Sequence, residues 1–240
     1  MRKSPSVPRG DRIYAIGDIH GRLDLFMILI ERIREDAARR PARRTRLVLI
    51  GDVVDRGPSS AELVNHLMRF GRQTERLIVL RGNHEQVMIE ALRGDLEALQ
   101  SWLRFGGEET LKSWGVRDES FGGSLEDLYR AASVAIGPDV FLWLNSLPFS
   151  YRSGDFFFVH AGIRPGVALD EQDPEDMLWI GDEFTSATQE HEAIVVHGHT
   201  ICEHGPEILR NRIGLDTGAY RTDRLAAVGF EGSRQWVITS

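Results

Sequence analysis

Five short runs of β-branched and aromatic residues recur along the chain, and each is followed by a glycine beside Asp, Asn or His. The runs cover residues 13–16, 47–50, 77–80, 156–159 and 194–196. They are continuously apolar rather than alternating, which is typical of strands buried on both faces. Helical patterns over residues 23–38 and 61–70 lie between the first three runs. This strand–helix alternation predicts an α/β fold with a largely parallel sheet.

The end of the chain has a different pattern. Residues 225–230 and 235–239 are two short strand-like segments that are joined through Glu231-Gly232. Such a pair predicts a β-hairpin with a short turn. Because a hairpin is antiparallel, we expect mixed rather than purely parallel sheets.

The length of 240 residues suits one large domain or two small ones. We expect a flexible tail over residues 1–11 and a single domain over residues 12–240. Within it, residues 89–105 and 125–143 look helical and are separated by two glycine pairs. They predict a mainly helical, cap-like insertion at about residues 89–147, which either covers the core or forms part of the main body.

A formal net charge of −7 and a single cysteine, Cys202, exclude several classes of protein. The acidic balance argues against a general nucleic-acid binder, which normally presents a basic field. One cysteine excludes an internal disulfide framework and fits a reducing compartment. No apolar stretch approaches the ~18–20 residues of a membrane span, and the N-terminus lacks the apolar region of a secretory signal. We therefore expect a cytoplasmic protein with no nucleic-acid or membrane partner.

Polar side chains that can bind metal follow the apolar runs. In an open α/β sheet the carboxyl ends of the strands share one edge, so these side chains are expected to converge there. They are Asp18, His20, Asp52, Asn83, His160 and His199. Hard oxygens and borderline imidazoles without a thiolate suit two ions of Mn²⁺, Fe or Zn²⁺ better than Ca²⁺. Two metals about 3.5–4 Å apart form a clamp for in-line displacement at phosphorus.

Each element also has a purely structural interpretation. A lone His160 or His199 is more often a hydrogen-bonded core histidine, and Asn83 is a reasonable N-cap for a helix that starts near Gln86. Residues 51–57 alone are compatible with a simple turn. Five such elements, each directly after a buried strand, favour one shared site.

The motifs resemble the signature of the PPP family of metallophosphatases. The match consists of Gly17-Asp18-Ile19-His20-Gly21, Gly51-Asp52-Val53-Val54-Asp55-Arg56-Gly57 and Gly82-Asn83-His84-Glu85, extended by His160-Ala161-Gly162 and Gly198-His199-Thr200. It spans about residues 12–220, and the chain looks most like the short bacterial serine/threonine protein phosphatases. The resemblance implies a calcineurin-like metallophosphoesterase fold, in which helices flank a two-sheet mixed β-sandwich.

The resemblance also implies roles for individual residues. Asp18 and His20 would hold the first metal, Asp52 would bridge both, and Asn83, His160 and His199 would complete the second site. The motif alignment favours His199 over His197 as the ligand. His84 would be the general acid, oriented by Asp55, and Arg56 would bind phosphate oxygens. Arg164 and Tyr220 are further candidates for substrate binding.

These roles lead to three hypotheses about function. The first is a dinuclear-metal phosphomonoesterase, with Mn²⁺ as the favoured metal, that uses a metal-bridging hydroxide on phosphoserine or phosphothreonine in proteins. The second is a hydrolase of dinucleoside polyphosphates with the same site. The third is an inactive binding module, which would be expected to lack a ligand or the acid, whereas every expected position is filled here. The expected partner is a phosphorylated protein or another phosphoester.

Overall fold

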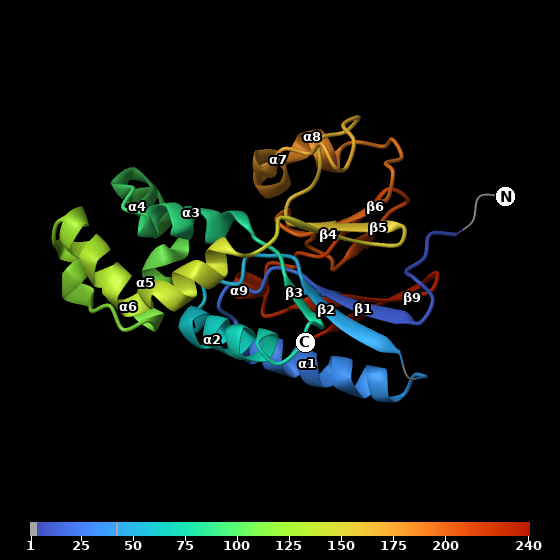
Figure 1. Cartoon of the computed structure of the whole chain (residues 1–240), viewed down its shortest axis with the longest axis horizontal. Helices are drawn as coiled ribbons and strands as arrows, with labels where there is room; N and C mark the ends of the chain where they lie inside the picture. The colour runs from blue at the N-terminus through green and yellow to red at the C-terminus, as the bar shows by residue number, and fades with distance from the viewer. Residues whose placement is uncertain (1–3, 42) are drawn as a thin grey trace.

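The computed structural model describes residues 4–41 and 43–240, and these residues form two five-stranded sheets (Figure 1). The first sheet has the order β10-β9-β1-β2-β3 and contains β1 Asp11–Ile16, β2 Arg44–Leu49, β3 Leu77–Val79, β9 Ala226–Glu231 and β10 Arg234–Thr239. Strands β1, β2 and β3 are parallel, whereas β9 is antiparallel to both β1 and β10. The C-terminal hairpin predicted from the sequence is confirmed.

The second sheet repeats this mixed arrangement. Its order is β4-β5-β6-β8-β7, with β4 Ser150–Ser153, β5 Phe156–Val159, β6 Ile194–His197, β7 Glu207–Ile208 and β8 Arg212–Gly214. The three central strands are parallel, and the two edge strands are antiparallel to their neighbours. Both sheets are therefore mixed, as predicted.

The two sheets pack face to face, and strand alternation explains the apolar runs. In β1, Ile13 and Ala15 belong to the core that also contains Phe156 from the second sheet. Tyr14 and Ile16 belong to a different core, shared with the helices. Because both faces of β1 are covered, all of its side chains are buried. The predicted two-sheet sandwich flanked by helices is confirmed.

Helices cover the outer faces of the sandwich (Figure 1). Helices α1 Leu23–Ala38 and α2 Ser60–Gly71 lie on the first sheet, and the short helices α7 Pro174–Trp179 and α8 Asp182–Thr185 lie on the second. Helix α1 has the predicted bounds, and its apolar stripe buries Leu25, Phe26, Leu29 and Ile33. A further short helix is α9 Ala219–Thr222.

Residues 83–145, here called the helical block, lie between β3 of the first sheet and β4 of the second along the chain. The block contains α3 Asn83–Leu92, α4 Leu96–Trp102, the π-helical turn η1 Leu103–Gly107, α5 Glu108–Ser113, the 3₁₀ turn η2 Asp118–Gly122 and α6 Leu125–Asn145. The single helix predicted over residues 89–105 is wrong. Gly94 has a φ of 97°, and the Asp95 side chain caps the start of α4. The buried side chains of the block share the core of α1 and α2.

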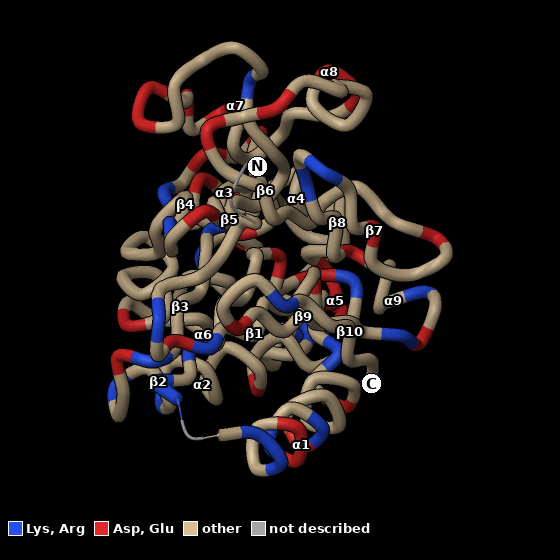
Figure 2. The backbone as a smooth tube through the Cα atoms, turned by 90° about the vertical axis from the view of Figure 1, so that its right-hand side faces the viewer, with Lys and Arg blue, Asp and Glu red and all other residues tan. Residues whose placement is uncertain are grey.

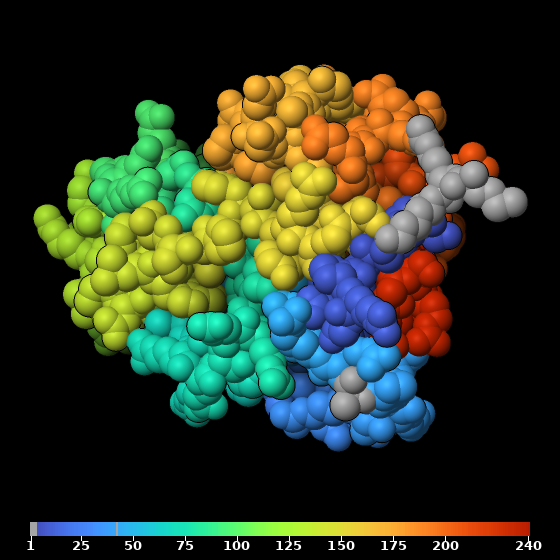
Figure 3. Space-filling view, turned by 45° about the vertical axis from the view of Figure 1, so that its right-hand side comes forward, coloured from blue at the N-terminus to red at the C-terminus, as the bar shows by residue number. Residues whose placement is uncertain are grey.

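The first described residues pack against the C-terminal hairpin, although a flexible tail was predicted over residues 1–11. Val7 is buried and its N–H donates to Gly232 O at 3.0 Å, while Asp11 begins β1. Figure 3 shows this segment (blue) against the hairpin (red). Met1 to Lys3 lie outside the described residues.

Along the described backbone, Lys and Arg are interspersed with Asp and Glu (Figure 2). None of the helices in this part of the chain is apolar and long enough to cross a membrane.

Candidate active site and metal centre

The loops that follow five strands meet at one end of the sandwich. Asp18 and His20 follow β1, Asp52 follows β2, Asn83 begins α3 just after β3, His160 follows β5 and His199 follows β6. All of these side chains except that of His199 are buried. The convergence predicted from the carboxyl ends of the strands is thus present, and it joins both sheets.

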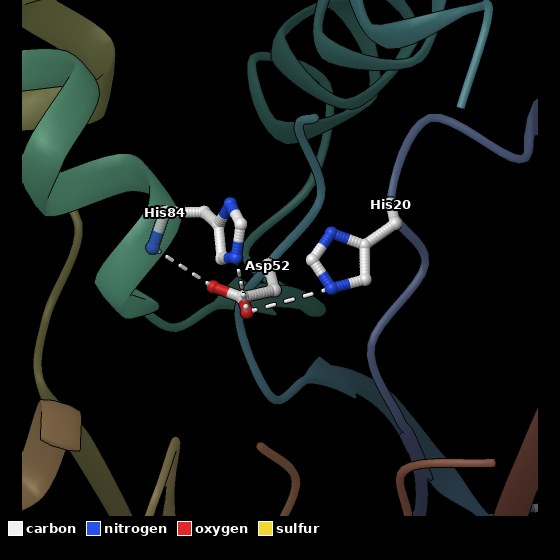
Figure 4. A group of neighbouring side chains, drawn as sticks. All are labelled: His20, Asp52 and His84. Carbon is white, nitrogen blue, oxygen red and sulfur yellow. Dashed lines mark hydrogen bonds and ion pairs between the residues drawn. The ribbon is translucent and has the colours of Figure 1, made fainter. Parts of the chain in front are cut away.

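Asp52 lies at the centre of the group. Its Oδ2 is 3.7 Å from His20 Nε2, 3.9 Å from His84 Nε2 and 3.5 Å from His160 Nε2. Its Oδ1 accepts a hydrogen bond of 3.1 Å from the His84 backbone N–H. Figure 4 shows Asp52 between the imidazoles of His20 and His84. One carboxylate therefore faces two different sets of nitrogen ligands.

Two overlapping groups of potential ligands share this carboxylate. In one, the ligand atoms of His20, Asp52 and His84 lie within 4.8 Å of one another, and in the other those of Asp52, His160 and His199 do. Asn83 joins the second group, because its Oδ1 lies 2.8 Å from His160 Nε2. The donor set of imidazole, carboxylate and amide suits borderline divalent cations.

Asp18 supplies a test of whether a cation fits. Its Oδ2 accepts from the His199 backbone N–H at 3.0 Å, but its Oδ1 is buried without a hydrogen-bond partner among the described residues. Burial and the nearby carboxylates of Asp216 and Asp52 raise the pKa of Asp18 well above its usual value. A buried, unpartnered carboxylate oxygen is costly in an apo protein. The residues present therefore fit bound cations.

The backbone of the site is held in an unusual conformation. Six described residues other than glycine have positive φ, and five of them are predicted site residues: His20 (47°), Asp52 (46°), Asp55 (73°), Arg56 (68°) and His199 (60°). Left-handed conformations cost about 1–2 kcal/mol per residue. Glycine is also required at Gly82 and Gly198, because a Cβ there would overlap the carboxylates of Asp52 and Asp18, respectively. Such strain is common where side chains must be aimed at a ligand.

Glu85 supports the Asp52 loop, a role that the sequence did not reveal. Its fully buried carboxylate accepts from the backbone N–H groups of Gly82 and Asp52 at 2.8 Å, of Val53 at 2.9 Å and of Val54 at 3.2 Å. Glu85 thereby ties the loop after β2 to the start of α3. The sequence does contain a signal for this role, because Glu85 stands three residues after Gly82, the spacing of a capping box.

Helix α3 starts earlier than the capping alternative required. Asn83 is its first residue and Gly82 is the N-cap, so the interpretation of Asn83 as an N-cap is wrong. The reason is that the capping box closes one residue earlier, where Gly82 is the N-cap and Glu85, at the third helical position, accepts from the Gly82 N–H. The Asn83 side chain is free to face His160 instead.

His84 lies between a carboxylate and a guanidinium. Its Nδ1 is 2.6 Å from Asp55 Oδ2, and its Nε2 is 3.0 Å from Arg56 Nη2. A carboxylate accepts and a guanidinium donates, so Nδ1 carries the proton and Nε2 accepts in this arrangement. Burial alone would lower the pKa of His84, but the carboxylates of Asp52 and Asp55 raise it above its usual value.

The three predicted phosphate- or substrate-binding residues have different surroundings. The Arg56 guanidinium lies 2.9 Å from His20 Nε2 and 4.6 Å from the centre of the Tyr220 ring. Arg164 instead binds Asp176 on α7 and Glu183 on α8. Because these acids occupy its Nε and both terminal nitrogens, the structure does not support Arg164 as a phosphate ligand. All the other predicted site residues are brought together.

His197 packs behind the site. Its ring centre is 5.1 Å from that of Phe184, and its Nδ1 lies 3.0 Å from Gly198 O. His199 belongs to a group of potential ligands, whereas His197 belongs to none among the described residues. Burial lowers the pKa of His197 to about 3. The preference for His199 over His197 agrees with this geometry.

A neutral, buried His197 makes the stability of the metal-free protein depend on pH. Below about pH 6.5 the unfolded chain takes up a proton at this position that the folded protein does not, so stability is lost as the pH falls from about 6.5 toward 3. His197→Asn keeps a donor for Gly198 O and should remove a slope of at most about 1.4 kcal/mol per pH unit. Urea unfolding in EDTA at pH 4.5, 5.5, 6.5 and 7.5 measures the slope. His204→Asn, at an exposed position, should leave the pH dependence of the unfolding free energy unchanged. Equal slopes in the two variants would contradict the role given to His197.

Comparison with known proteins places the site in a family context. Residues 11–224 match the family model described as calcineurin-like phosphoesterase. A symmetrical bis(5'-nucleosyl)-tetraphosphatase of Aromatoleum aromaticum is 29% identical over 154 residues, which cover 64% of this chain and 45% of that protein. Serine/threonine-protein phosphatase 1 of Salmonella typhimurium is 36% identical over 96 residues, 40% of this chain and 39% of that protein.

The two relatives match only part of this chain in sequence, whereas a solved structure matches nearly all of its fold. The chain spans about half the length of the symmetrical tetraphosphatases that it matches. A protein serine/threonine phosphatase structure from Saccharomyces cerevisiae is 15% identical and superimposes with a TM-score of 0.57, covering 98% of this chain and 84% of that one. At this identity the likeness concerns the fold alone.

Proposed function

Since the chain belongs to the calcineurin-like phosphoesterase family, we propose that it is a phosphoester hydrolase that uses two divalent cations at the Asp52 cluster. The observation that carries the proposal is the position of the Asp52 carboxylate, which is shared by two groups of potential ligands. The buried, unpartnered Oδ1 of Asp18 supports it independently.

The ligands divide between two cations. Asp18, whose buried Oδ1 is unpartnered among the described residues, would hold one together with His20 and Asp52, while His84, whose Nδ1 is bound to Asp55, is kept for proton transfer. Asp52 with Asn83, His160 and His199 would hold the other. When bound, such a pair supplies a nucleophile at neutral pH by lowering the pKa of water and neutralises charge on the phosphoryl group. Mn²⁺ is the favoured metal, with Fe or Zn²⁺ as alternatives.

Arg56 and His84 would act on the substrate. The guanidinium fork of Arg56 matches two phosphate oxygens. Arg56 Nη1 lies 2.9 Å from His20 Nε2 and occupies the lone pair of that nitrogen. The guanidinium must therefore move away before His20 Nε2 can bind a metal. Turning toward phosphate also frees His84 Nε2, which can then take up a proton from solvent and deliver it to the leaving oxygen while Asp55 holds Nδ1–H.

Two substrate classes remain distinct proposals. The first is phosphoserine or phosphothreonine in proteins, supported by the motif resemblance and by the Salmonella relative. The second is dinucleoside polyphosphates, supported by the tetraphosphatase relatives and by aromatic rings beside the cluster. The ring centres of Phe105, Tyr220 and Trp179 lie 6.3, 5.3 and 6.4 Å from those of His84, His20 and His199, respectively. Aromatic rings in such positions can stack on a nucleobase.

A side-by-side assay tests the reaction and separates the substrates. Protein loaded with Mn²⁺, Fe²⁺ or Zn²⁺ is assayed on p-nitrophenyl phosphate, a phosphoserine peptide and diadenosine tetraphosphate, with product analysis. We expect turnover that EDTA lowers about 100-fold or more, because the metals provide several kcal/mol of transition-state stabilisation. Metal binding without hydrolysis of any of the three would favour the inactive binding module and overturn the proposal.

A further inference from the structure

Two side chains of the helical block converge on Asp55, the residue that contacts His84. The indole Nε1 of Trp102, at the end of α4, lies 2.9 Å from Asp55 Oδ1 and 3.0 Å from Oδ2. The hydroxyl of Thr110, on α5, donates to Asp55 Oδ1 at 2.6 Å. All three residues are fully buried. Helices α4 and α5 therefore both contact the carboxylate that holds His84.

The hydrogen bonds leave Asp55 a single orientation. A carboxylate only accepts, and here Oδ1 receives Thr110 and Trp102 while Oδ2 receives Trp102 and His84 Nδ1. Rotating the carboxylate would break several short bonds at once in a place that water does not reach. The direction of the His84 imidazole is thus tied to the positions of α4 and α5.

The block also fixes the backbone of the same loop. The Asp55 N–H donates to Thr110 Oγ1 at 2.8 Å and to Ser60 Oγ at 3.1 Å, and the Arg56 N–H donates to Gly106 O at 3.2 Å. A Cβ on Gly106 would lie 2.7 Å from the Arg56 nitrogen, so the two segments are in close contact. Asp55 and Arg56 are among the residues with positive φ, a conformation that needs such support.

Packing alone does not account for these contacts. A phenylalanine and a valine would fill similar volumes, whereas burying an indole N–H and a hydroxyl is costly unless each finds a partner. Both groups donate to the carboxylate that also contacts His84. We propose that Trp102 and Thr110 are positioning residues, which hold Asp55 so that His84 delivers its proton to the leaving oxygen.

The proposal rests on the proposed function and concerns one step of it. An oxygen derived from water bonds to phosphorus, the bond from phosphorus to the leaving oxygen breaks, and that oxygen keeps the electron pair. The leaving oxygen then takes the proton from the protonated Nε2 of His84, while the His84 Nδ1–H remains hydrogen-bonded to Asp55. The importance of this proton depends on the leaving group: a strongly acidic phenol departs as its anion, whereas a weakly acidic phenol or alcohol needs the proton.

The test compares two substrates across matched variants. Thr110→Val removes the hydroxyl and Thr110→Ser retains it; Trp102→Phe removes the indole donor. With Mn²⁺ present, we expect Thr110→Val and Trp102→Phe to lower kcat on phenyl phosphate about 10-fold or more but on 2,4-dinitrophenyl phosphate less than about 3-fold. Thr110→Ser should stay close to wild type on both. His84→Asn should give the largest selective loss, about 10²–10⁴-fold on phenyl phosphate.

Leu111→Val is the control, because Leu111 is a fully buried residue next to Thr110. Leu111→Val should change kcat on the two substrates by the same factor or leave both values unchanged. The positioning role is overturned if Thr110→Val and Trp102→Phe lower both rates equally, or lower neither, while His84→Asn remains selective. Absence of wild-type hydrolysis on both substrates would instead overturn the proposed function. If Trp102→Phe does not fold, the Val and Ser pair at Thr110 decides the outcome.

Discussion

Asp52→Asn is expected to lower kcat/KM on an aryl phosphate about 1000-fold or more. Asp52 is the residue common to both groups of potential ligands, and asparagine has its shape but not its charge. Loss of about 4 kcal/mol of transition-state stabilisation corresponds to that factor. The measurement is steady-state hydrolysis with saturating Mn²⁺, together with metal content after gel filtration, which should fall below that of the wild type.

The matched control is Asp127→Asn. Asp127 is exposed on α6 and pairs with Arg130, so its loss should change kcat/KM less than about twofold, as surface substitutions usually have small effects. Asp52→Asn with wild-type activity and metal content would contradict the shared-carboxylate site. Reduced activity in both variants would point to a general effect on the fold.

Glu85→Gln is expected to lower the free energy of unfolding by about 3 kcal/mol. The two carboxylate oxygens of Glu85 accept from four backbone N–H groups. An amide replaces one oxygen by NH₂, which faces two of those donors, and each unsatisfied buried donor costs about 1–3 kcal/mol. Urea unfolding in EDTA measures the change without any contribution from bound metal.

Glu90→Gln provides the comparison on the same helix. Its side chain is partly exposed and accepts from Gln86 Nε2 at 2.8 Å, so we expect a change within about 0.5 kcal/mol. Glu85→Gln with wild-type stability would show that the loop after β2 does not depend on the carboxylate. Retained stability with lost hydrolysis would assign Glu85 to orientation of Asp52 alone.

The strands and their polar ends were predictable because both are local signals. Continuous apolar runs follow from burial on two faces, as in β1 and β5, and the side chains after them occupy fixed positions relative to the strand ends. The convergence of Asp18 and Asp52 therefore required only the rule that parallel strands share an edge. His160 follows β5 of the second sheet and joins them because the two sheets pack face to face. The bounds of α1 were predictable for the same reason, since its apolar period is regular.

The supporting residues were not predictable, because their partners are distant along the chain. Trp102 and Thr110 contact Asp55 across 47 and 55 residues of chain, respectively. The break between α3 and α4 depends on one positive φ at Gly94. Arg164 resembled a phosphate ligand by its place after a motif, whereas acids on α7 and α8 determine its position.

The position of β9 has a consequence for how the chain is synthesised. Strand β1 is bordered by β9 on one side, and Arg12 forms a buried ion pair with Glu231, 219 residues away. Until β9 leaves the ribosome, β1 has an unpaired edge made of residues that are all buried in the finished protein. Open apolar edges of this kind promote aggregation of folding intermediates. The nascent chain therefore exposes this edge of β1 while all the residues between β1 and β9 are being synthesised.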